Sequence, residues 1–186
     1  MTTRDPEAKR RRLLEAALTE FAEYGIAGAR VDRLVKRAGV SAGLVYSFCD
    51  GKAGLFEAVY EAIVDEVVEG IPIDATDLAE YAGRLYDAST QHPEVMRFMS
   101  WYALERSGAD ARPSVVGAMK SKVAAIADAQ QRGLVSKRLD AGQLLMLIIA
   151  IANMWQREGA EAHALVTSEA RRTAVIVAVQ RLASVD

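Results

Sequence analysis

Positive charge gathers in the part of the chain whose side chains are best suited to binding nucleic acid. Lysine and arginine outnumber aspartate and glutamate by ten to seven over residues 1–52, but number thirteen against eighteen over residues 53–186. The net charges of +3 and −5 give the −2 of the whole chain. A basic segment joined to an acidic body is typical of a nucleic-acid-binding protein whose second part has another task. A solvated basic terminus without a partner is the alternative.

Two short helices that flank a tight turn would position these cations. Four apolar residues recur at the spacing of one helix face: Val31, Leu34, Val35 and Ala38. Gly39 follows them, and glycine tolerates the left-handed backbone that ends a helix abruptly. Ser41 is expected to cap a second helix with its side chain, and Val45 and Cys49 to form the buried side of that helix. The pattern predicts a helix-turn-helix, whose second helix enters a DNA major groove.

The residues of this segment carry a resemblance to a known family. The stretch AGVSAGLVY, followed by Lys52 and Leu55-Phe56, resembles the DNA-binding head of the TetR (tetracycline repressor-like) family of transcriptional regulators. The resemblance extends back through Phe21 to Ala16-Ala17 and covers about the first third of the chain. It implies that the helix-turn-helix belongs to a three-helix head, that the third helix lies in the major groove, and that two heads act as a two-fold dimer.

The resemblance and the positions of the cations together give a set of candidate DNA-binding residues. They are Arg30, Lys36, Arg37, Ser41, Ala42, Gly43, Leu44, Tyr46 and Lys52. In the family pattern the residues from Ser41 to Leu44 form the exposed start of the reading helix, Tyr46 contacts the DNA backbone and Lys52 reaches a phosphate. Lys36 and Arg37 end the preceding helix, where contact with DNA and simple solvation are both open.

Three positions depart from the family pattern. Ala29 and Arg30 stand where a threonine or serine usually caps the second helix, and the loss of such a cap costs about 1 kcal/mol, with Gly28 as a partial substitute. Phe48 replaces a histidine or tyrosine, and Cys49 replaces a buried phenylalanine, so that Phe48 is expected to turn inward. A redox switch and a small core residue are the two interpretations of Cys49.

Helix signals continue along the chain and predict an all-α fold of about nine helices. Helices are expected to begin at Asp5-Pro6, at Asp50-Gly51, within residues 74–77, at Pro93, at Pro113, at Asp140 and at Ser168. Gly25 is expected to end the first of them, and His163 to lie in a loop or at a helix end. We predict a head at residues 1–52 and a helical effector-binding and dimerisation domain at residues 53–186, connected by the helix that starts near residue 52.

Apolar side chains in the second domain favour a ligand cavity, with an ordinary core as the alternative. The candidate ligand-binding residues are Phe98, Trp101, Tyr102, Met119 and Asn153. A buried Asn153 amide needs a hydrogen-bond partner, which backbone, a second subunit or an effector would supply. The effector expected from such a lining is small and hydrophobic, with one or two polar groups.

The apolar run Leu144–Ala152 indicates that two copies of the chain associate. It is too short to span a bilayer, which needs about 20 apolar residues, and a helix that is apolar all round must be buried all round. The small residues Ala174 and Ala178 would let a neighbouring helix approach closely. We therefore expect a homodimer through these two helices, while burial of the run within its own domain remains the alternative.

The remaining features define the class of protein. One cysteine forms no internal disulfide, and no apolar segment follows the charged start of the chain, so a cytoplasmic protein without a membrane partner is expected. We find no pattern of catalytic groups, no phosphate loop and no paired ligands for a metal at His92 or His163, so neither enzymatic activity nor a cofactor is expected. The sequence predicts a repressor that binds near-palindromic double-stranded DNA and is released by an effector. The alternatives are a DNA-binding dimer without an effector and, less favoured, an enzyme.

Overall fold

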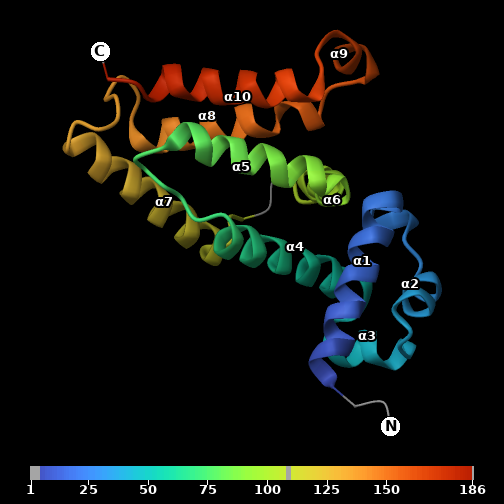
Figure 1. The fold of residues 1–186 in the computed structure, drawn as a ribbon. Coiled ribbons are helices and arrows are strands. Elements are labelled where there is room, and N and C mark those ends of the chain that lie inside the picture. The colour runs from blue at the N-terminus through green and yellow to red at the C-terminus, as the bar shows by residue number, and fades with distance from the viewer. Residues whose placement is uncertain (1–4, 108–109, 186) are drawn as a thin grey trace. The chain divides into compact units, whose positions relative to one another are not determined.

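The computed structural model describes residues 5–107 and 110–185, and this part of the chain is helical without strands (Figure 1). The α-helices are α1 (Pro6–Gly28), α2 (Val31–Ala38), α3 (Ala42–Phe48), α4 (Gly51–Gly70), α5 (Leu78–Gln91), α6 (Pro93–Glu105), α7 (Pro113–Gln131), α8 (Ala141–Asn153), α9 (Ala160–Leu165) and α10 (Ser168–Ala183), with a 3₁₀ turn at Met154–Gln156. The all-α prediction is confirmed. The short helix α9, which contains His163, is the element that the sequence pattern did not predict.

By packing, the chain divides into two compact units. Unit 1 comprises residues 1–67 and 93–109, and unit 2 comprises residues 68–92 and 110–186. Helix α6 therefore belongs to the same unit as the helix-turn-helix and packs against α1, although it follows α5 in the sequence. The predicted boundary at residue 52 concerns the division of function and stays a prediction.

Unit 1 is built around a cluster of aromatic rings from three helices. Phe21 of α1, Phe56 of α4 and Phe98 of α6 are almost completely buried. The centroid of the Phe56 ring lies 5.1 Å from that of Phe21 and 4.9 Å from that of Phe98. Tyr102 stacks on Tyr60 with centroids 3.8 Å apart. These contacts bury large apolar surfaces and fasten α4 and α6 to the long helix α1.

Helix α1 begins as its sequence predicts and extends beyond the glycine that interrupts it. Asp5 accepts a hydrogen bond from Glu7 N, and Pro6 occupies the first turn. Gly25 adopts a non-helical backbone with a φ of 63°, so the regular helix is interrupted there, as the glycine predicts, although a short further segment extends α1 to Gly28. A Cβ atom at Gly25 would lie 3.0 Å from the Trp101 ring. Both the backbone and the close approach of Trp101 therefore favour glycine here.

In unit 2 the helices α5, α8 and α10 pack against one another, and α7 packs against α8 (Figure 1). Its core holds Tyr81, Ile126, Leu144, Ile148 and Val179, all almost inaccessible to solvent. Asp140 and Gln143 form a capping box that starts α8, as the aspartate predicted. The cap of α10 is Thr167 rather than Ser168, because the Thr167 hydroxyl accepts the hydrogen bond from Ala170 N.

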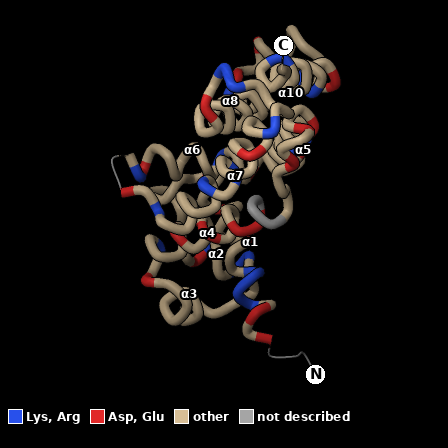
Figure 2. Tube along the Cα trace, turned by 90° about the vertical axis from the view of Figure 1, so that its left-hand side faces the viewer, with Lys and Arg blue, Asp and Glu red and all other residues tan. Residues whose placement is uncertain are grey.

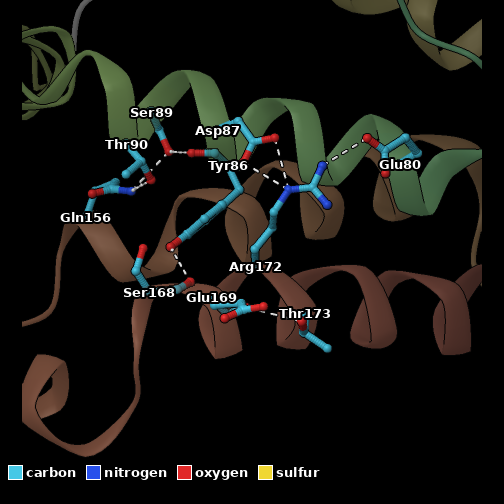
Figure 3. A network of polar contacts seen from close by, with 10 residues as sticks. All are labelled: Glu80, Tyr86, Asp87, Ser89, Thr90, Gln156, Ser168, Glu169, Arg172 and Thr173. Atoms are coloured by element: carbon cyan, nitrogen blue, oxygen red, sulfur yellow. Dashed lines mark hydrogen bonds and ion pairs between the residues drawn. The ribbon is translucent and has the colours of Figure 1, made fainter.

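A polar network fastens α5 to α10 (Figure 3). Arg172 on α10 donates to both carboxylate oxygens of Asp87 at 3.0 Å and to Glu80 at 2.9 Å. These contacts raise the pKa of Arg172, first through the hydrogen bond to Asp87. The guanidinium passes over Gly83, where a Cβ atom would lie 3.1 Å from it. The Tyr86 hydroxyl donates to Ser168 O at 3.2 Å beside this pair, so the interface combines apolar packing with directed bonds.

No helix in the described parts of the chain combines the length and the apolar character needed to cross a membrane.

Candidate nucleic-acid interface

The turn between α2 and α3 has the geometry that its glycine predicts. Gly39 adopts a left-handed φ of 64°, and Val40 N donates to Val35 O at 3.2 Å, which closes the end of α2. Leu34 and Ala38 of α2 and Val45 of α3 are buried against the unit 1 core. The two helices are thus held by their apolar sides, and the helix-turn-helix prediction is confirmed.

The first turn of α3 faces solvent. Ser41, Ala42 and Gly43 are exposed, Leu44 is half-buried, and Tyr46 has 67% of its surface accessible. Ser41 occupies the N-cap position, but its hydroxyl makes no capping bond; the Ser41 carbonyl instead accepts from Leu44 N at 3.0 Å. Ser41 is therefore at the predicted N-cap position, but the prediction that its side chain makes the capping bond is wrong. The turn closes through backbone, which leaves the Ser41 hydroxyl out of the cap.

The start of helix α2 is hydrogen-bonded to a side chain that the sequence reasoning missed. The Glu20 carboxylate on α1 is almost fully buried, and its Oε1 accepts from Arg30 N at 2.9 Å and from Arg33 Nε at 2.8 Å. It thereby satisfies the N–H of Arg30, the N-cap residue of α2. It does not replace a threonine or serine cap, whose hydroxyl would accept from an N–H two or three residues further on, and the N-cap side chain itself makes no capping bond. The Gly28 carbonyl accepts from Arg33 at 3.0 Å.

The electrostatics of Glu20 follow from these contacts. Burial alone would raise the pKa of Glu20, but the hydrogen bond from Arg33, the bond from Arg30 N and the charges of Arg33 and Arg37 outweigh burial and lower the pKa. Arg33 also stacks on the Tyr24 ring, 4.2 Å from its centroid. One signal was present in the sequence, since Glu20 lies seven residues after Leu13 on the apolar stripe of α1, where a carboxylate needs a partner.

The candidate cations differ in what they contact. Arg30 donates twice to the Asp32 carboxylate, at 3.0 and 2.9 Å, and both side chains are exposed. Lys36 and Arg37 are exposed in the last turn of α2. Lys52 donates from Nζ to Ala29 O at 3.1 Å and to Ala27 O at 3.4 Å. Lys52 thus ties the start of α4 to the segment between α1 and α2, and its contact with phosphate stays a prediction.

More positive charge lies along the beginning of α1, where basic residues follow one another closely (Figure 2). The Arg10 guanidinium lies 4.7 Å from the centroid of the Phe48 ring. Phe48 is half-buried and packs against the unit 1 core, as expected from the small neighbour Cys49. Burial raises the pKa of the Cys49 thiol, and the nearby Glu61 adds to this although Arg10 opposes it. A protonated thiol favours the interpretation of Cys49 as a small core residue.

The five candidate ligand-binding residues fall in both units. Phe98 and Tyr102 belong to the aromatic cluster of unit 1, where the Tyr102 hydroxyl donates to Glu57 at 3.0 Å, and Trp101 lies against Gly25. Met119 and Asn153 belong to unit 2. The Asn153 amide donates to Ile149 O one turn earlier, at 2.9 Å, so backbone supplies the partner that the sequence left open.

Two open hollows lie on the surface of unit 2, and neither contains Met119 or Asn153. One, of about 370 Å³, is lined by Pro72, Ile73, Asp74, Asp77, Glu80 and Arg84. The other, of about 390 Å³, is lined by Tyr86, Asp87, Thr90, Gln91, Ser168, Glu169 and Arg172. Among residues 5–107 and 110–185, no group of three or more histidine, cysteine, aspartate and glutamate side chains is placed to bind a metal ion.

Comparison with known proteins extends this picture to nearly the whole chain. Residues 13–59 match the family model "Bacterial regulatory proteins, tetR family", and residues 77–181 match "Tetracyclin repressor-like, C-terminal domain". The HTH-type transcriptional repressor SCO4008 of Streptomyces coelicolor is 37% identical over 82% of this chain and 81% of its own length.

Solved structures agree with the sequence relatives. The transcriptional regulator SCO4942 of Streptomyces coelicolor superposes with a TM-score of 0.84 at 33% identity, over 94% of this chain and 98% of its own. The regulator FadR of Bacillus subtilis, solved with stearoyl-CoA, has a TM-score of 0.69 at 14% identity over 91% of this chain and 97% of its own, which shows the shared fold alone. By its matched domains and by its relatives, the chain belongs to the TetR family of helix-turn-helix transcriptional regulators.

Proposed function

We propose that the chain is a homodimeric repressor that binds a near-palindromic operator and leaves it when a small effector binds. The exposed first turn of α3 carries this proposal. Val45 anchors the helix, Ser41 and Ala42 expose small side chains to solvent, and the exposed Gly43 has no side chain. A helix start of this kind approaches the base edges of a major groove without steric hindrance.

Cations near this turn would provide the contacts that hold the protein on DNA. Lys36 and Arg37 are exposed at the end of α2, and Lys52 keeps one further donor beyond its two carbonyl contacts. Such contacts fix orientation on the duplex and carry no sequence information. Arg30 is the weakest member of the set, because Asp32 neutralises its charge.

An apolar surface on unit 2 supports dimerisation. On α8, Leu145 and Ile148 are buried, whereas Met146 and Leu147 expose 50% and 39% of their surfaces. On α10, Ala170, Ala174 and Val177 are exposed as well. A second copy that covers these helices would bury the apolar run of α8 on both sides. A two-fold dimer presents two α3 helices, which suits half-sites about one helical turn (34–36 Å) or slightly more apart.

The effector would bind among apolar side chains of the second domain. Met119 packs against the unit 2 core, and Asn153 directs its amide to its own helix, so both suit a largely apolar lining. The aromatic trio Phe98, Trp101 and Tyr102 is kept as a candidate within unit 1. A DNA-binding dimer without an effector is the second candidate. Enzymatic activity has no support from the family, whose named relatives are transcriptional regulators.

Selection from a random duplex library tests the DNA part. Binding to one enriched near-palindrome, with a complex mass of one dimer per duplex by sedimentation, is the expected result. Enrichment of unrelated sequences, or a complex with one protomer, would contradict it. Screening compounds for release of that duplex then separates a regulator with an effector from one without.

A further inference from the structure

The side chain of Lys122, in the middle of α7, is buried although it carries an ammonium group. It exposes 8% of its surface, and its Nζ donates to the Tyr81 hydroxyl of α5 at 2.9 Å. Nζ also lies 5.3 Å from the centroid of the Tyr81 ring. Tyr81 itself is fully buried. The Lys122 ammonium group and the Tyr81 hydroxyl therefore form a polar pair inside a largely apolar core.

Among the side chains that the structure describes (residues 5–66, 70–107 and 110–185), Lys122 forms no ion pair with a carboxylate. An ammonium group has three donors, and the Tyr81 hydroxyl accepts only one of them. A buried charge without a counter-ion is unfavourable, because water no longer solvates it. Arg172 in the same unit provides a contrast, since it is less buried and yet two carboxylates hold it (Figure 3). Arg172 is therefore paired with carboxylates, whereas the more deeply buried Lys122 has no such partner among the described side chains.

The side chains around Lys122 are apolar. Met119 and Val123, its neighbours on α7, pack against the unit 2 core, and Ile126 is completely buried one turn further on. These side chains are apolar and offer no hydrogen bonds. A ligand that meets both features has one negatively charged head and an apolar body.

We propose that Lys122, together with the Tyr81 hydroxyl, binds the anionic head of an amphipathic organic acid, and that Met119 and its apolar neighbours contact the body of that molecule. This inference rests on the proposed function, in which unit 2 binds an effector. It names the chemical class of the effector as an organic anion in place of a neutral hydrophobic compound. Binding would supply the missing counter-ion to Lys122 and the missing acceptors to its N–H groups.

Two dyes that differ by one sulfonate test the assignment. The anionic dye is 8-anilinonaphthalene-1-sulfonate and the neutral dye is N-phenyl-1-naphthylamine, and fluorescence titration measures the affinity of each for the full chain. Lys122→Met should weaken binding of the sulfonate by at least tenfold and change binding of the neutral dye by less than twofold. Lys122→Gln, which keeps a polar side chain without the charge, should give the same result. Lys120→Met is the matched control, since Lys120 is exposed on the same helix.

The outcomes separate the anion site from the regulatory role. Equal losses for both dyes, no loss for either, or a wild-type chain that binds neither dye saturably would overturn the assignment and leave Lys122 as a packing residue. Each variant is compared only if its helical circular dichroism and thermal unfolding match those of the wild type, and Lys122→Gln serves if Lys122→Met does not fold. If the sulfonate binds through Lys122 but saturating dye leaves affinity for the selected operator unchanged, the anion site stands and release by an effector fails.

Discussion

Arg33 on α2 donates from Nε to Oε1 of Glu20 on α1 at 2.8 Å, and the Glu20 side of this contact is excluded from water. The same oxygen accepts from Arg30 N at 2.9 Å. One carboxylate therefore joins the first helix to the start of the second. The orientation of the helix-turn-helix depends on a residue outside the motif.

The replacement Glu20→Ala should lower the free energy of unfolding by about 1–3 kcal/mol, because it removes the acceptor of the Arg30 N–H and of Arg33 Nε. Urea denaturation followed by circular dichroism measures the change. Glu23→Ala is the matched control, since Glu23 is exposed on the same helix and should change stability by less than about 0.5 kcal/mol. Similar losses for the two variants would show that the contacts of Glu20 with Arg30 and Arg33 do not stabilise the start of α2.

Acid should weaken the same contact. The pKa of Glu20 is lowered in the folded chain, so its carboxylate contributes stability at a pH above the unfolded value of about 4.3, and the contribution is lost as the pH falls through the lower folded value. Free energies of unfolding measured from pH 6 down to about pH 3 should fall more steeply for the wild type than for Glu20→Gln. Exposed Asp32 and Asp74, whose pKa values are also lowered, remain in both proteins and cancel in the comparison.

Replacing Lys52 tests whether its side chain contacts a DNA phosphate or serves only to hold the backbone carbonyls of Ala27 and Ala29. Lys52→Ala should weaken binding to all DNA sequences alike and reduce the slope of log affinity against log salt by about 0.9 for each protomer bound, as expected for one phosphate contact. Fluorescence anisotropy at several salt concentrations measures it. An unchanged slope with lower stability would mean that Lys52 serves only the carbonyls of Ala27 and Ala29.

The predicted dimer surface is tested by adding charge. Met146→Glu places a carboxylate on the exposed apolar face of α8, and it should shift the chain from dimer to monomer in sedimentation velocity and weaken operator binding. Val116→Glu is the control, because Val116 is exposed to 36% on α7, outside the proposed surface. A dimer that survives Met146→Glu would remove α8 from the interface.

Two glycines in helices of unit 2 form a matched pair. Gly83→Ala places a methyl group 3.1 Å from the Arg172 guanidinium and 3.3 Å from Ile176, which should disturb the contact between α5 and α10 and lower stability. Gly117→Ala on α7 meets no atom within 4 Å and should raise stability by about 0.5–1 kcal/mol, the helix-propensity gain. Thermal unfolding compares the stabilities of the two variants. An increase in stability for both would show that the Arg172 side chain moves aside without weakening the contact between α5 and α10.

The sequence alone determined the features that depend on local chemistry. Gly39 fixed the turn between α2 and α3, Asp5-Pro6 and Asp140 fixed helix starts, and the apolar spacing from Val31 to Ala38 fixed which side of α2 is buried. Each of these depends on residues within a few positions of one another. The pattern AGVSAGLVY likewise sufficed for the family.

Only the tertiary structure decided the contacts between distant residues. Glu20 binds the Arg30 N–H at the start of α2 from ten residues upstream, α6 belongs to the same compact unit as the helix-turn-helix although α5 precedes it, and Lys122 contacts Tyr81 across 41 positions. The sequence pattern gives the buried side of each helix but not its neighbour. A carboxylate or an ammonium group on such a side shows that a partner is needed, and the packing of the helices decides which partner it has.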